Sequence, residues 1–436
     1  MTLENLRQRR PHTGELTVVA GAGRSGLAAT RLLVERGARV RLLEREPGTV
    51  PDETWEQLRN LGVDCVFGEH KPEHFEHAVF VVPSPGIPVA RLAPLIAARD
   101  GVKPPEILAE TELAWRYLEG EPVLAITGTS GKTTTASLAA AMLQTQGYSV
   151  FLGGNIGTPL SEYVLGKRRA DVLVLEISSF QLQTCSTFRP RVGVLLNISS
   201  NHLDYHRDMR EYIEAKFRLF RCQDEGDLAV LASELRTPAK AFHLKARQVY
   251  IENTNRFAGC RLLGEHNKLN MEAAWQACRF FGVSAANAES AVAAFHPLPH
   301  RLETVRLHRG ITYINDSKCT TVAALRVALQ AMDKPVRLLC GGKFKGGDLA
   351  GLRGLVGKHV AEVALFGASR EKFEEAWQGT VPITRHEKLE SAVRLLNDHA
   401  QRGDVVLLSP GTSSFDLYAN YMERGNDFRR IVEALP

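Results

Sequence analysis

The sequence predicts an α/β protein of three domains, each built on a mostly parallel sheet, and three observations favour this fold class. Strand-like apolar runs alternate with helical patterns along nearly the whole chain, as in strand–helix–strand units. The length of 436 residues corresponds to about two to four domains of ordinary size. Polar and proline-rich breaks at 118–122 and 296–299 divide the chain into residues 1–119, 120–299 and 300–436.

The composition is that of a globular protein. Hydrophobic residues make up 44% of the chain and charged residues 24%, which excludes disorder as the main state. The excess of 54 Lys+Arg over 49 Asp+Glu is spread along the chain, so neither nucleic acid nor a membrane is indicated as a partner. The charged N-terminus predicts no secretory signal, and the seven cysteines contain no CxxC pair. We therefore expect a cytoplasmic protein without disulfides or a zinc site.

The first domain begins with a Rossmann-like pattern. Strands are expected at 16–20, 40–43 and 78–82, with a helix at 27–35. The turn Gly21-Ala-Gly-Arg-Ser-Gly26 opens this helix, and Glu44 ends the next strand, as in a dinucleotide-binding fingerprint. Read alone, the pattern favours an NAD-dependent oxidoreductase, which remains an alternative. A UDP-sugar also supplies a diphosphate and a ribose, and without a recognisable hydride site UDP is the better occupant.

The second domain contains the most specific motif. Gly128-Thr-Ser-Gly-Lys-Thr-Thr134 lies between a strand at 123–127 and a helix at 132–146, as a shortened relative of the Walker A loop. Backbone N–H groups and the helix N-terminus would bind phosphate oxygens. Lys132 can reach the terminal phosphates, and the Thr133 hydroxyl can hold Mg²⁺. A regulatory P-loop switch, which binds nucleotide and catalyses no synthesis, would have the same loop and remains an alternative.

Polar side chains follow two further strands of this domain. Glu176 ends the strand at 172–177, and Asn197 and His202 follow the strand at 192–198. The carboxyl ends of parallel strands face the ligand crevice. A carboxylate and an imidazole beside a phosphate loop suit a second metal ion that bridges substrate oxygens.

A helix expected at 209–222 carries a lysine where an apolar residue would fit. Lys216 falls inside a buried stripe whose members are Met209, Tyr212, Ile213, Phe217 and Phe220. A bare buried ammonium costs several kcal/mol unless it is paired or deprotonated. Two interpretations remain open: the side chain extends to solvent, or a neutral amine captures CO₂ to become a carbamate that binds metal beside Glu176 and His202.

The third domain follows a stiff connector at Pro297–Pro299, a candidate hinge. Strands are expected at 311–314, 336–339, 363–366 and 405–408, again alternating with helical segments. This alternation predicts a second Rossmann-like domain at the C-terminal end.

Short motifs in order along the whole chain carry a family resemblance. They are GTSGKTT at 128–134, GGNIG at 153–157, LEISSFQL at 175–182, NHLDYH at 201–206, YIEAK at 212–216, GEHNKLN at 264–270, LPHRLE at 298–303, NDSK at 315–318, LLSPGTSSFD at 407–416 and NYMERG at 420–425. Together they resemble the Mur ligase family, ADP-forming acid–amino-acid ligases of peptidoglycan precursor synthesis. LEISSFQL, SPGTSSFD and SPGI at 84–87 are most similar to the member that adds D-glutamate to UDP-N-acetylmuramoyl-L-alanine.

The resemblance implies a role for each matching residue. Catalysis would depend on Lys132, Glu176, His202 and Lys216. Two Mg²⁺ ions would be held by Thr133, Glu176, His202 and the carbamate of Lys216. ATP would contact Gly128, Thr129, Ser130, Gly131, Lys132, Thr133, Thr134, Asn270, Arg301 and Asp316. The UDP substrate would contact Arg24, Ser25, Glu44, Arg45, Gly86, Asn155 and His202. The amino acid would contact Lys318, Thr320, Lys345, Ser414 and Tyr421.

The resemblance also implies the reaction and its partners. We expect a monomer that uses ATP, Mg²⁺ and a CO₂-derived carbamate to join D-glutamate to the UDP substrate through an acyl phosphate. Two departures from the family pattern, the segment Gly411-Thr-Ser-Ser414 and Phe344, lie near the predicted glutamate pocket. They concern amino-acid specificity, so L-glutamate or another amino acid remains an alternative acceptor.

Overall fold

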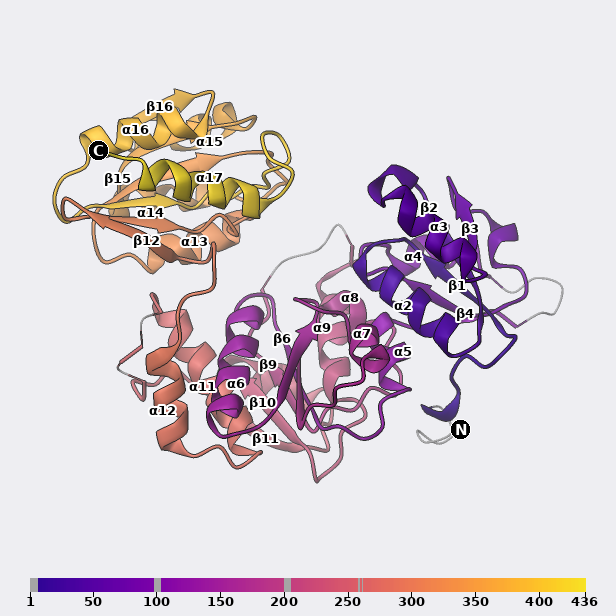
Figure 1. The fold of residues 1–436 in the computed structure, drawn as a ribbon. Helices are drawn as coiled ribbons and strands as arrows, with labels where there is room; N and C mark the ends of the chain where they lie inside the picture. Colours follow the sequence, from indigo (N-terminus) through magenta and orange to yellow (C-terminus); the bar gives the residue numbers. More distant parts are fainter. Residues whose placement is uncertain (1–6, 98–102, 200–204, 258, 261) are drawn as a thin grey trace. The chain divides into compact units, whose positions relative to one another are not determined.

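The computed structural model describes residues 7–97, 103–199, 205–257, 259–260 and 262–436, which form three mostly parallel sheets (Figure 1). The predicted fold class is confirmed. The chain forms two compact units: Met1–Arg256 with Leu269–Val292, and Phe257–Lys268 with Ala293–Pro436. The first unit contains two of the sheets. The predicted domain bounds at 119/120 and 299/300 stay predictions.

The first sheet has the order β3-β2-β1-β4-β5, and all its strands are parallel. Its strands are β1 (Leu16–Ala20), β2 (Arg39–Glu44), β3 (Asp64–Phe67), β4 (Ala78–Pro83) and β5 (Glu106–Ile107). Its helices are α2 (Arg24–Glu35), α3 (Asp52–Asn60) and α4 (Val89–Leu92). The order reverses between β1 and β4, which opens a ligand crevice at their carboxyl ends. A Cβ on Gly26 would overlap the Gly21 carbonyl oxygen, so only glycine lets α2 pack this closely on β1.

The second sheet has the order β11-β10-β9-β6-β8-β7 and is also parallel. Its strands are β6 (Val123–Thr127), β7 (Val150–Gly154), β8 (Val172–Glu176), β9 (Val192–Leu195), β10 (Leu228–Ala232) and β11 (Arg247–Ile251). The helices that accompany them are α6 (Lys132–Thr145), α7 (Leu160–Leu165), α8 (Ser179–Leu182), α9 (Met209–Phe217), α10 (Arg236–Lys240), α11 (Glu265–Arg279) and α12 (Ala285–Ala294). Because β6 lies between β9 and β8, the phosphate loop is flanked by the carboxyl ends of both.

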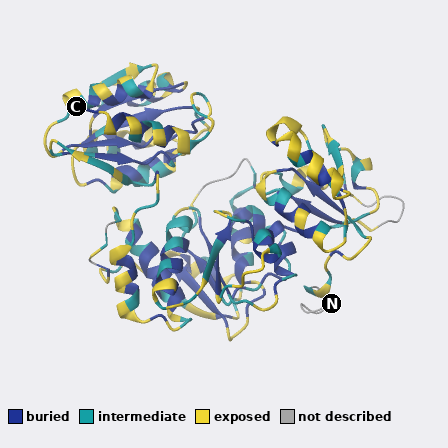
Figure 2. Ribbon diagram, in the orientation of Figure 1, coloured by how far each residue is buried: buried dark blue, intermediate teal, exposed yellow. Residues whose placement is uncertain are grey.

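Helix α5 (Glu110–Trp115) joins these two sheets through a shared hydrophobic core. That core contains Val19 and Val82 of the first sheet, Leu113 of α5, and Val123 and Leu175 of the second sheet. Figure 2 shows the buried residues concentrated along the strands. Both sheets therefore belong to the first compact unit.

The sheet of the second unit has the order β12-β13-β17-β14-β15-β16, with only the edge strand β12 antiparallel. Its strands are β12 (Glu303–His308), β13 (Ile311–Asn315), β14 (Val336–Gly341), β15 (Val360–Phe366), β16 (Ile383–His386) and β17 (Val405–Leu408). Its helices are α13 (Val322–Gln330), α14 (Arg353–His359), α15 (Arg370–Trp377), α16 (Leu389–His399) and α17 (Tyr421–Glu433). Separate core clusters form around Trp377 and around Phe428, so helices cover both faces.

Several predicted boundaries differ from the structure, and three of them lie near the site. Helix α2 begins at Arg24 rather than at 27, because the last residues of the glycine-rich turn already form its first turn. The helix expected at 209–222 ends at Phe217 and continues as a 3₁₀ turn over Arg218–Phe220. The strand expected at 192–198 ends at Leu195. Among the described residues, no helix has the length and apolar character needed to cross a membrane.

Candidate active site

The phosphate loop lies at the carboxyl end of β6, as predicted. Gly131, which precedes α6, has a φ of +84°, in the left-handed region that favours glycine. The Lys132 Nζ donates to the carbonyls of Gly128 and Thr129 at 3.0 and 3.1 Å, so its side chain folds over the loop. The loop and the N-terminus of the 14-residue helix α6 form a cradle for phosphate oxygens.

Two asparagines from other segments hold this loop in place. Asn197, which follows β9, accepts from the Ser130 N–H at 2.9 Å and donates to the Ser130 carbonyl at 3.2 Å. Asn270 on α11 is buried, and its side-chain oxygen lies where a Cβ on Gly131 would stand. The sequence places Asn197 after a strand without predicting its bond to the loop. Asn270, predicted to contact adenine, is thus adjacent to the phosphate loop.

Glu176, at the end of β8, lies between the phosphate loop and β7. Its Oε2 accepts from the Thr133 hydroxyl at 2.7 Å, and its Oε1 accepts from the Asn155 Nδ2 at 2.7 Å. The residue is only 2% exposed. The structure thus joins two predicted metal ligands, and Asn155, predicted to approach the UDP substrate, contacts one of them. The fourth predicted ligand, His202, lies outside the described residues.

The donor set around Glu176 fits magnesium. A carboxylate and a hydroxyl are the oxygen ligands that Mg²⁺ prefers, and it usually keeps several waters besides. Within the described ranges, no three His, Cys, Asp or Glu side chains cluster in a way that could hold a metal ion by themselves. Thr133 and Glu176 would therefore hold Mg²⁺ only together with further oxygens, from phosphate, from water or from a modified Lys216.

Lys216 is buried, which rules out the interpretation that its side chain extends to solvent. The residue is 1% exposed, and its Nζ donates to the Gly128 carbonyl at 2.9 Å. Burial, together with the nearby Lys132 ammonium, lowers the pKa of Lys216 well below its usual value. The neutral amine is the form that reacts with CO₂, so this environment suits carbamate formation.

The glycine-rich turn of the first sheet is closed by Glu44. The Ala22 N–H donates to its Oε2 at 2.6 Å, and the Glu46 N–H donates to its Oε1 at 3.1 Å. The Arg24 guanidinium reaches across to the carbonyl of Gly157, which follows β7. The Glu44 carboxylate therefore lies at the carboxyl ends of β1 and β2, as the fingerprint predicts.

The other residues predicted to bind the UDP substrate have no described contact with Glu44. Ser25 lies in the first turn of α2. Gly86 is exposed, with open space where a Cβ would stand. Arg45 is exposed and pairs with Glu69 at 3.5 Å. Their contacts with a substrate stay predictions.

Asp316, in the second unit, is buried after β13. Its Oδ1 accepts from the Leu302 N–H at 3.2 Å, and its Oδ2 accepts from the Ser409 hydroxyl at 2.9 Å. Burial raises the pKa of Asp316 to about 7, although these hydrogen bonds and the Arg301 charge act in the opposite direction. Asp316 and Arg301, both predicted to contact ATP, are thus electrostatically coupled.

This raised pKa predicts a pH dependence of stability. An unfolded aspartate loses its proton near pH 4, so between about pH 4 and 7 the folded state binds more protons and stability falls as pH rises. In Asp316→Asn this contribution disappears. The difference in Tm between the wild type and the variant should therefore change steadily from pH 5 to 7.5. The exposed Asp333→Asn serves as control, and a difference independent of pH would mean that Asp316 is ionised throughout.

Two of the residues predicted to bind the amino acid lie on paired loops. Lys343 and Ser413 exchange two backbone hydrogen bonds of 2.9 and 3.2 Å, which brings the loops that carry Lys345 and Ser414 side by side. Lys345 lies over the Phe415 ring with its Nζ 5.2 Å from the ring centre. These contacts place two of the five predicted residues on adjoining loops.

The remaining three predicted residues come from the chain after β13 and from α17. The Lys318 Nζ lies 3.9 Å from the centre of the Tyr421 ring. Thr320 is partly buried two residues further on. The structure therefore brings Lys318 and Tyr421 into direct contact, although they are far apart in the sequence.

Arg424 was given no role by the sequence analysis, although it lies in the motif NYMERG. It is fully buried, and its Nε donates to the Ser317 hydroxyl at 3.0 Å. Its Nη2 donates to the carbonyls of Ser317 and Thr412 at 2.9 and 3.1 Å. Burial lowers the pKa of Arg424 to about 10. Arg424 thereby fastens the segment before Lys318 to the segment before Ser414.

Comparison with known proteins agrees with this architecture. Three family models match the chain: the Mur ligase MurD-like N-terminal domain at residues 15–103, the Mur ligase middle domain at 126–259 and the Mur ligase glutamate ligase domain at 300–411. The central parallel sheet with its phosphate loop falls within the second of these. The chain belongs to the Mur ligase family, as its motifs predict.

Two relatives match over their whole length. A UDP-N-acetylmuramoylalanine–D-glutamate ligase from Desulfovibrio desulfuricans is 66% identical, with 100% of both chains covered. A ligase of the same name from Nitratidesulfovibrio vulgaris is 60% identical, also with 100% of both covered. Among solved structures, a MurF ligase from Thermotoga maritima in complex with ADP superposes with a TM-score of 0.59 at 19% identity, over 99% of both chains. At that identity the superposition supports the fold alone.

Proposed function

We propose that the protein adds D-glutamate to UDP-N-acetylmuramoyl-L-alanine at the expense of ATP, releasing ADP and phosphate. The observation that carries this proposal is the full-length identity of 66% and 60% to two ligases whose name states that reaction. The phosphate loop, Glu176 and the buried Lys216 supply the chemical groups that such a ligase needs. The cytoplasm, where UDP-linked precursors and ATP are available, is the expected location, and the expected partners are these small molecules.

The reaction would proceed in two steps. The alanine carboxylate of the UDP substrate attacks the γ-phosphate of ATP, which gives an acyl phosphate and ADP. The amine of glutamate then attacks the acyl carbon, and phosphate leaves. The chain's part in the first step is to bind the phosphates through the loop N–H groups and the Lys132 ammonium, which stabilise charge on the transferring phosphoryl group.

Magnesium is assigned to the oxygens described above. We place one ion at Thr133, near the nucleotide phosphates, and a second at Glu176, with His202 and a carbamate on Lys216 completing the set. When bound, Mg²⁺ would neutralise phosphate charge during the transfer. The burial of Lys216 and its lowered pKa support this carbamate, which would add two oxygens.

The other substrates are assigned by position. Arg24, Ser25, Glu44, Arg45 and Gly86 would receive the UDP moiety, because they lie at or just after the ends of β1, β2 and β4, and open α/β sheets bind ligands where the strand order reverses. The residues Lys318, Thr320, Lys345, Ser414 and Tyr421 would receive glutamate. Two lysines with hydroxyl groups suit a ligand with two carboxylates.

Phosphate release tests the proposed function directly. The protein is incubated with ATP, Mg²⁺ and UDP-N-acetylmuramoyl-L-alanine, in parallel with D-glutamate and with L-glutamate. We expect turnover with D-glutamate only. Turnover with L-glutamate only would keep the chemistry and change the acceptor, whereas absence of turnover with either would contradict the proposal.

Replacement of Glu44 tests the assignment of the first crevice. Glu44→Ala removes a carboxylate that two backbone N–H groups hold in place. Loss of a charged hydrogen bond to the ribose is expected to raise the KM for the UDP substrate on the order of 10-fold, while the KM for ATP stays nearly constant. Steady-state kinetics with each substrate varied in turn measures both values.

Glu46→Ala is the matched control, because Glu46 is an exposed glutamate two residues further along the chain. It should leave both KM values unchanged. Equal increases for the UDP substrate and for ATP in Glu44→Ala would refute the placement of UDP in this crevice.

A further inference from the structure

His206 is a buried residue of the first unit that is not among the predicted site residues. It is 1% exposed. Its Nε2 lies 2.9 Å from the hydroxyl of Ser179, the first residue of α8. Helix α8 begins only three residues after Glu176, so this hydrogen bond ties His206 to the strand end that carries the proposed metal ligand.

A second contact of His206 leads toward Lys216. The imidazole packs against the Tyr212 ring, with ring centres 5.2 Å apart and planes inclined by 55°. Tyr212 is itself buried, and the Lys216 Nζ lies 4.6 Å from the centre of its ring. The Tyr212 hydroxyl lies 3.0 Å from the Thr129 hydroxyl of the phosphate loop. The position of the Tyr212 ring therefore bears on both the Lys216 amine and the loop.

Neighbouring rings leave the imidazole little freedom to turn. The Phe180 and Tyr205 rings lie 5.6 and 5.2 Å from it, and they stack on each other at 3.8 Å. The Tyr205 hydroxyl donates to the Ile87 carbonyl at 3.4 Å, which anchors this stack to the loop after β4. His206 is thus held among side chains from α8, from its own segment and from α9.

Lys216, in contrast, has a weak hold on its position. Its described hydrogen bond is to one backbone carbonyl, that of Gly128. A flexible four-carbon side chain needs packing around it to stay in one rotamer. The Tyr212 ring supplies part of that packing, and the His206 imidazole packs against the same ring.

We infer that His206 is a positioning residue that keeps the Lys216 amine in a fixed position relative to the Glu176 carboxylate. Its hydrogen bond to Ser179 fixes the distance to the β8 end, and its ring fixes Tyr212 beneath the amine. This inference rests on the proposed function, because it concerns the lysine assigned to carry the carbamate. A change at His206 should therefore lower the fraction of Lys216 that is carbamylated at a given CO₂ concentration.

Two substitutions separate the two contacts. His206→Phe keeps a ring against Tyr212 and loses the hydrogen bond to Ser179. His206→Gln keeps a side-chain donor within reach of Ser179 and loses the ring. Ser179→Ala removes the same hydrogen bond from the other side without altering the aromatic packing, and keeps the question answerable if a His206 variant folds poorly. The exposed neighbour Arg207→Gln is the control.

The measurement is the carbamate itself, by ¹³C NMR of the full-length protein in ¹³C-labelled bicarbonate, together with turnover over a range of bicarbonate concentrations. We expect ADP affinity equal to that of the wild type, a several-fold lower carbamate signal, and turnover that falls about 10-fold and recovers as bicarbonate rises. Arg207→Gln should behave as the wild type.

Two results would overturn the inference alone: wild-type carbamate occupancy in the His206 and Ser179 variants, or lost turnover with undiminished carbamate and unchanged bicarbonate dependence. The second of these is what a merely structural role predicts. Absence of a carbamate signal in an active wild type would instead overturn the assignment of Lys216 in the proposed function, and the inference with it.

Discussion

Lys216→Ala is expected to lower kcat by at least about 10²- to 10³-fold while nucleotide binding survives. The scale is that of removing one group that stabilises the charge of a transition state. The phosphate loop is held by the side chain of Asn197, which does not depend on the lysine, so the ATP site should persist. Phosphate release measures kcat, and calorimetric titration with ADP measures binding.

The matched control for this experiment is Lys240→Ala, because Lys240 is an exposed lysine of the same unit. It should leave turnover unchanged. If Lys216→Ala retained full activity, no carbamate would be needed and the assignment of a second metal at Glu176 would fail. If ADP binding were lost as well, Lys216 would act on the loop through its bond to Gly128 rather than on the metal.

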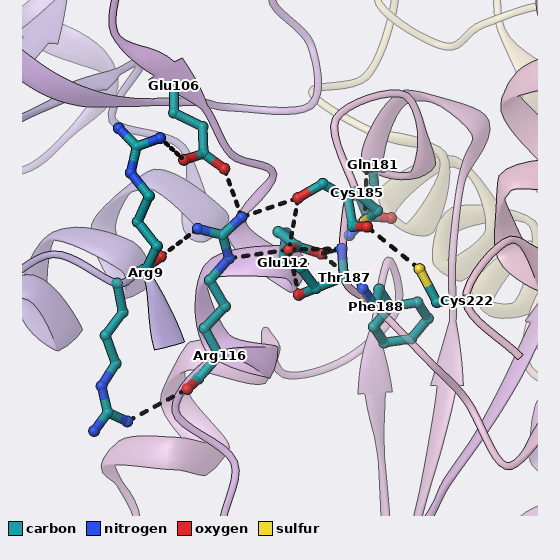
Figure 3. Close-up of polar contacts among 11 residues, drawn as sticks. Arg9, Glu106, Glu112, Arg116, Gln181, Cys185, Thr187, Phe188 and Cys222 are labelled. Atoms are coloured by element: carbon teal, nitrogen blue, oxygen red, sulfur yellow. Dashed lines mark hydrogen bonds and ion pairs between the residues drawn. The ribbon is translucent and has the colours of Figure 1, made fainter. Parts of the chain in front are cut away.

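Glu112→Ala is expected to destabilise the protein by about 3 to 5 kcal/mol, the cost of breaking a buried ion pair by removing one partner. The Glu112 side chain on α5 is 0% exposed. Its carboxylate accepts from the Arg116 Nε at 3.0 Å, from the hydroxyl and N–H of Thr187 at 2.7 and 3.0 Å, and from the Phe188 N–H at 3.0 Å (Figure 3). Alanine would leave these donors buried without an acceptor.

The remaining contacts of Arg116 explain why the loss would spread. Its guanidinium also donates to the Arg9 carbonyl, to the Glu106 carboxylate at 2.6 Å and to the Ser186 hydroxyl at 2.9 Å (Figure 3). These partners come from the N-terminal segment, from β5 and from the chain after α8. The pair on α5 therefore joins the two sheets of the first unit.

Chemical unfolding in urea measures this effect. The control is Glu214→Ala, which removes an exposed carboxylate from an ion pair with the same i,i+4 spacing, to Arg210 at 2.9 Å. That change should alter stability by less than about 0.5 kcal/mol. An equal, small loss in both variants would mean that the buried network contributes no more than a surface pair.

The parts of the site that lie close together in the sequence were predictable from it. The phosphate loop is a local structure, in which Gly131 adopts a left-handed φ and Lys132 folds back onto Gly128. Glu176 and Asn197 could be placed because the carboxyl ends of parallel strands meet at one edge of a sheet. Seven strands were not predicted: β3, β5, β7, β10, β11, β12 and β16. Of these, the edge strands β12 and β16 carry too many polar residues for an apolar run.

Contacts between distant segments could not be predicted. From periodicity alone, the Lys216 side chain could either extend to solvent or lie in the core. Only the packing of α9 shows that it is buried. The bond of Asn155 to Glu176 depends on the register of β7 against β8. The Arg424 guanidinium binds Ser317 and Thr412, which lie 107 and 12 positions away from it in the sequence. None of these leaves a pattern in the local sequence.

The sequence alone thus determines the fold class and the phosphate loop, because hydrophobic periodicity and short-range loop geometry are local properties of the chain. Its short motifs carry the resemblance to the Mur ligase family. Only the tertiary structure determines which polar groups come into contact and which amine is removed from solvent. Burial of Lys216 lowers its pKa because the surrounding chain excludes solvent. Such desolvation arises only when helices and strands from distant parts of the sequence pack around one side chain.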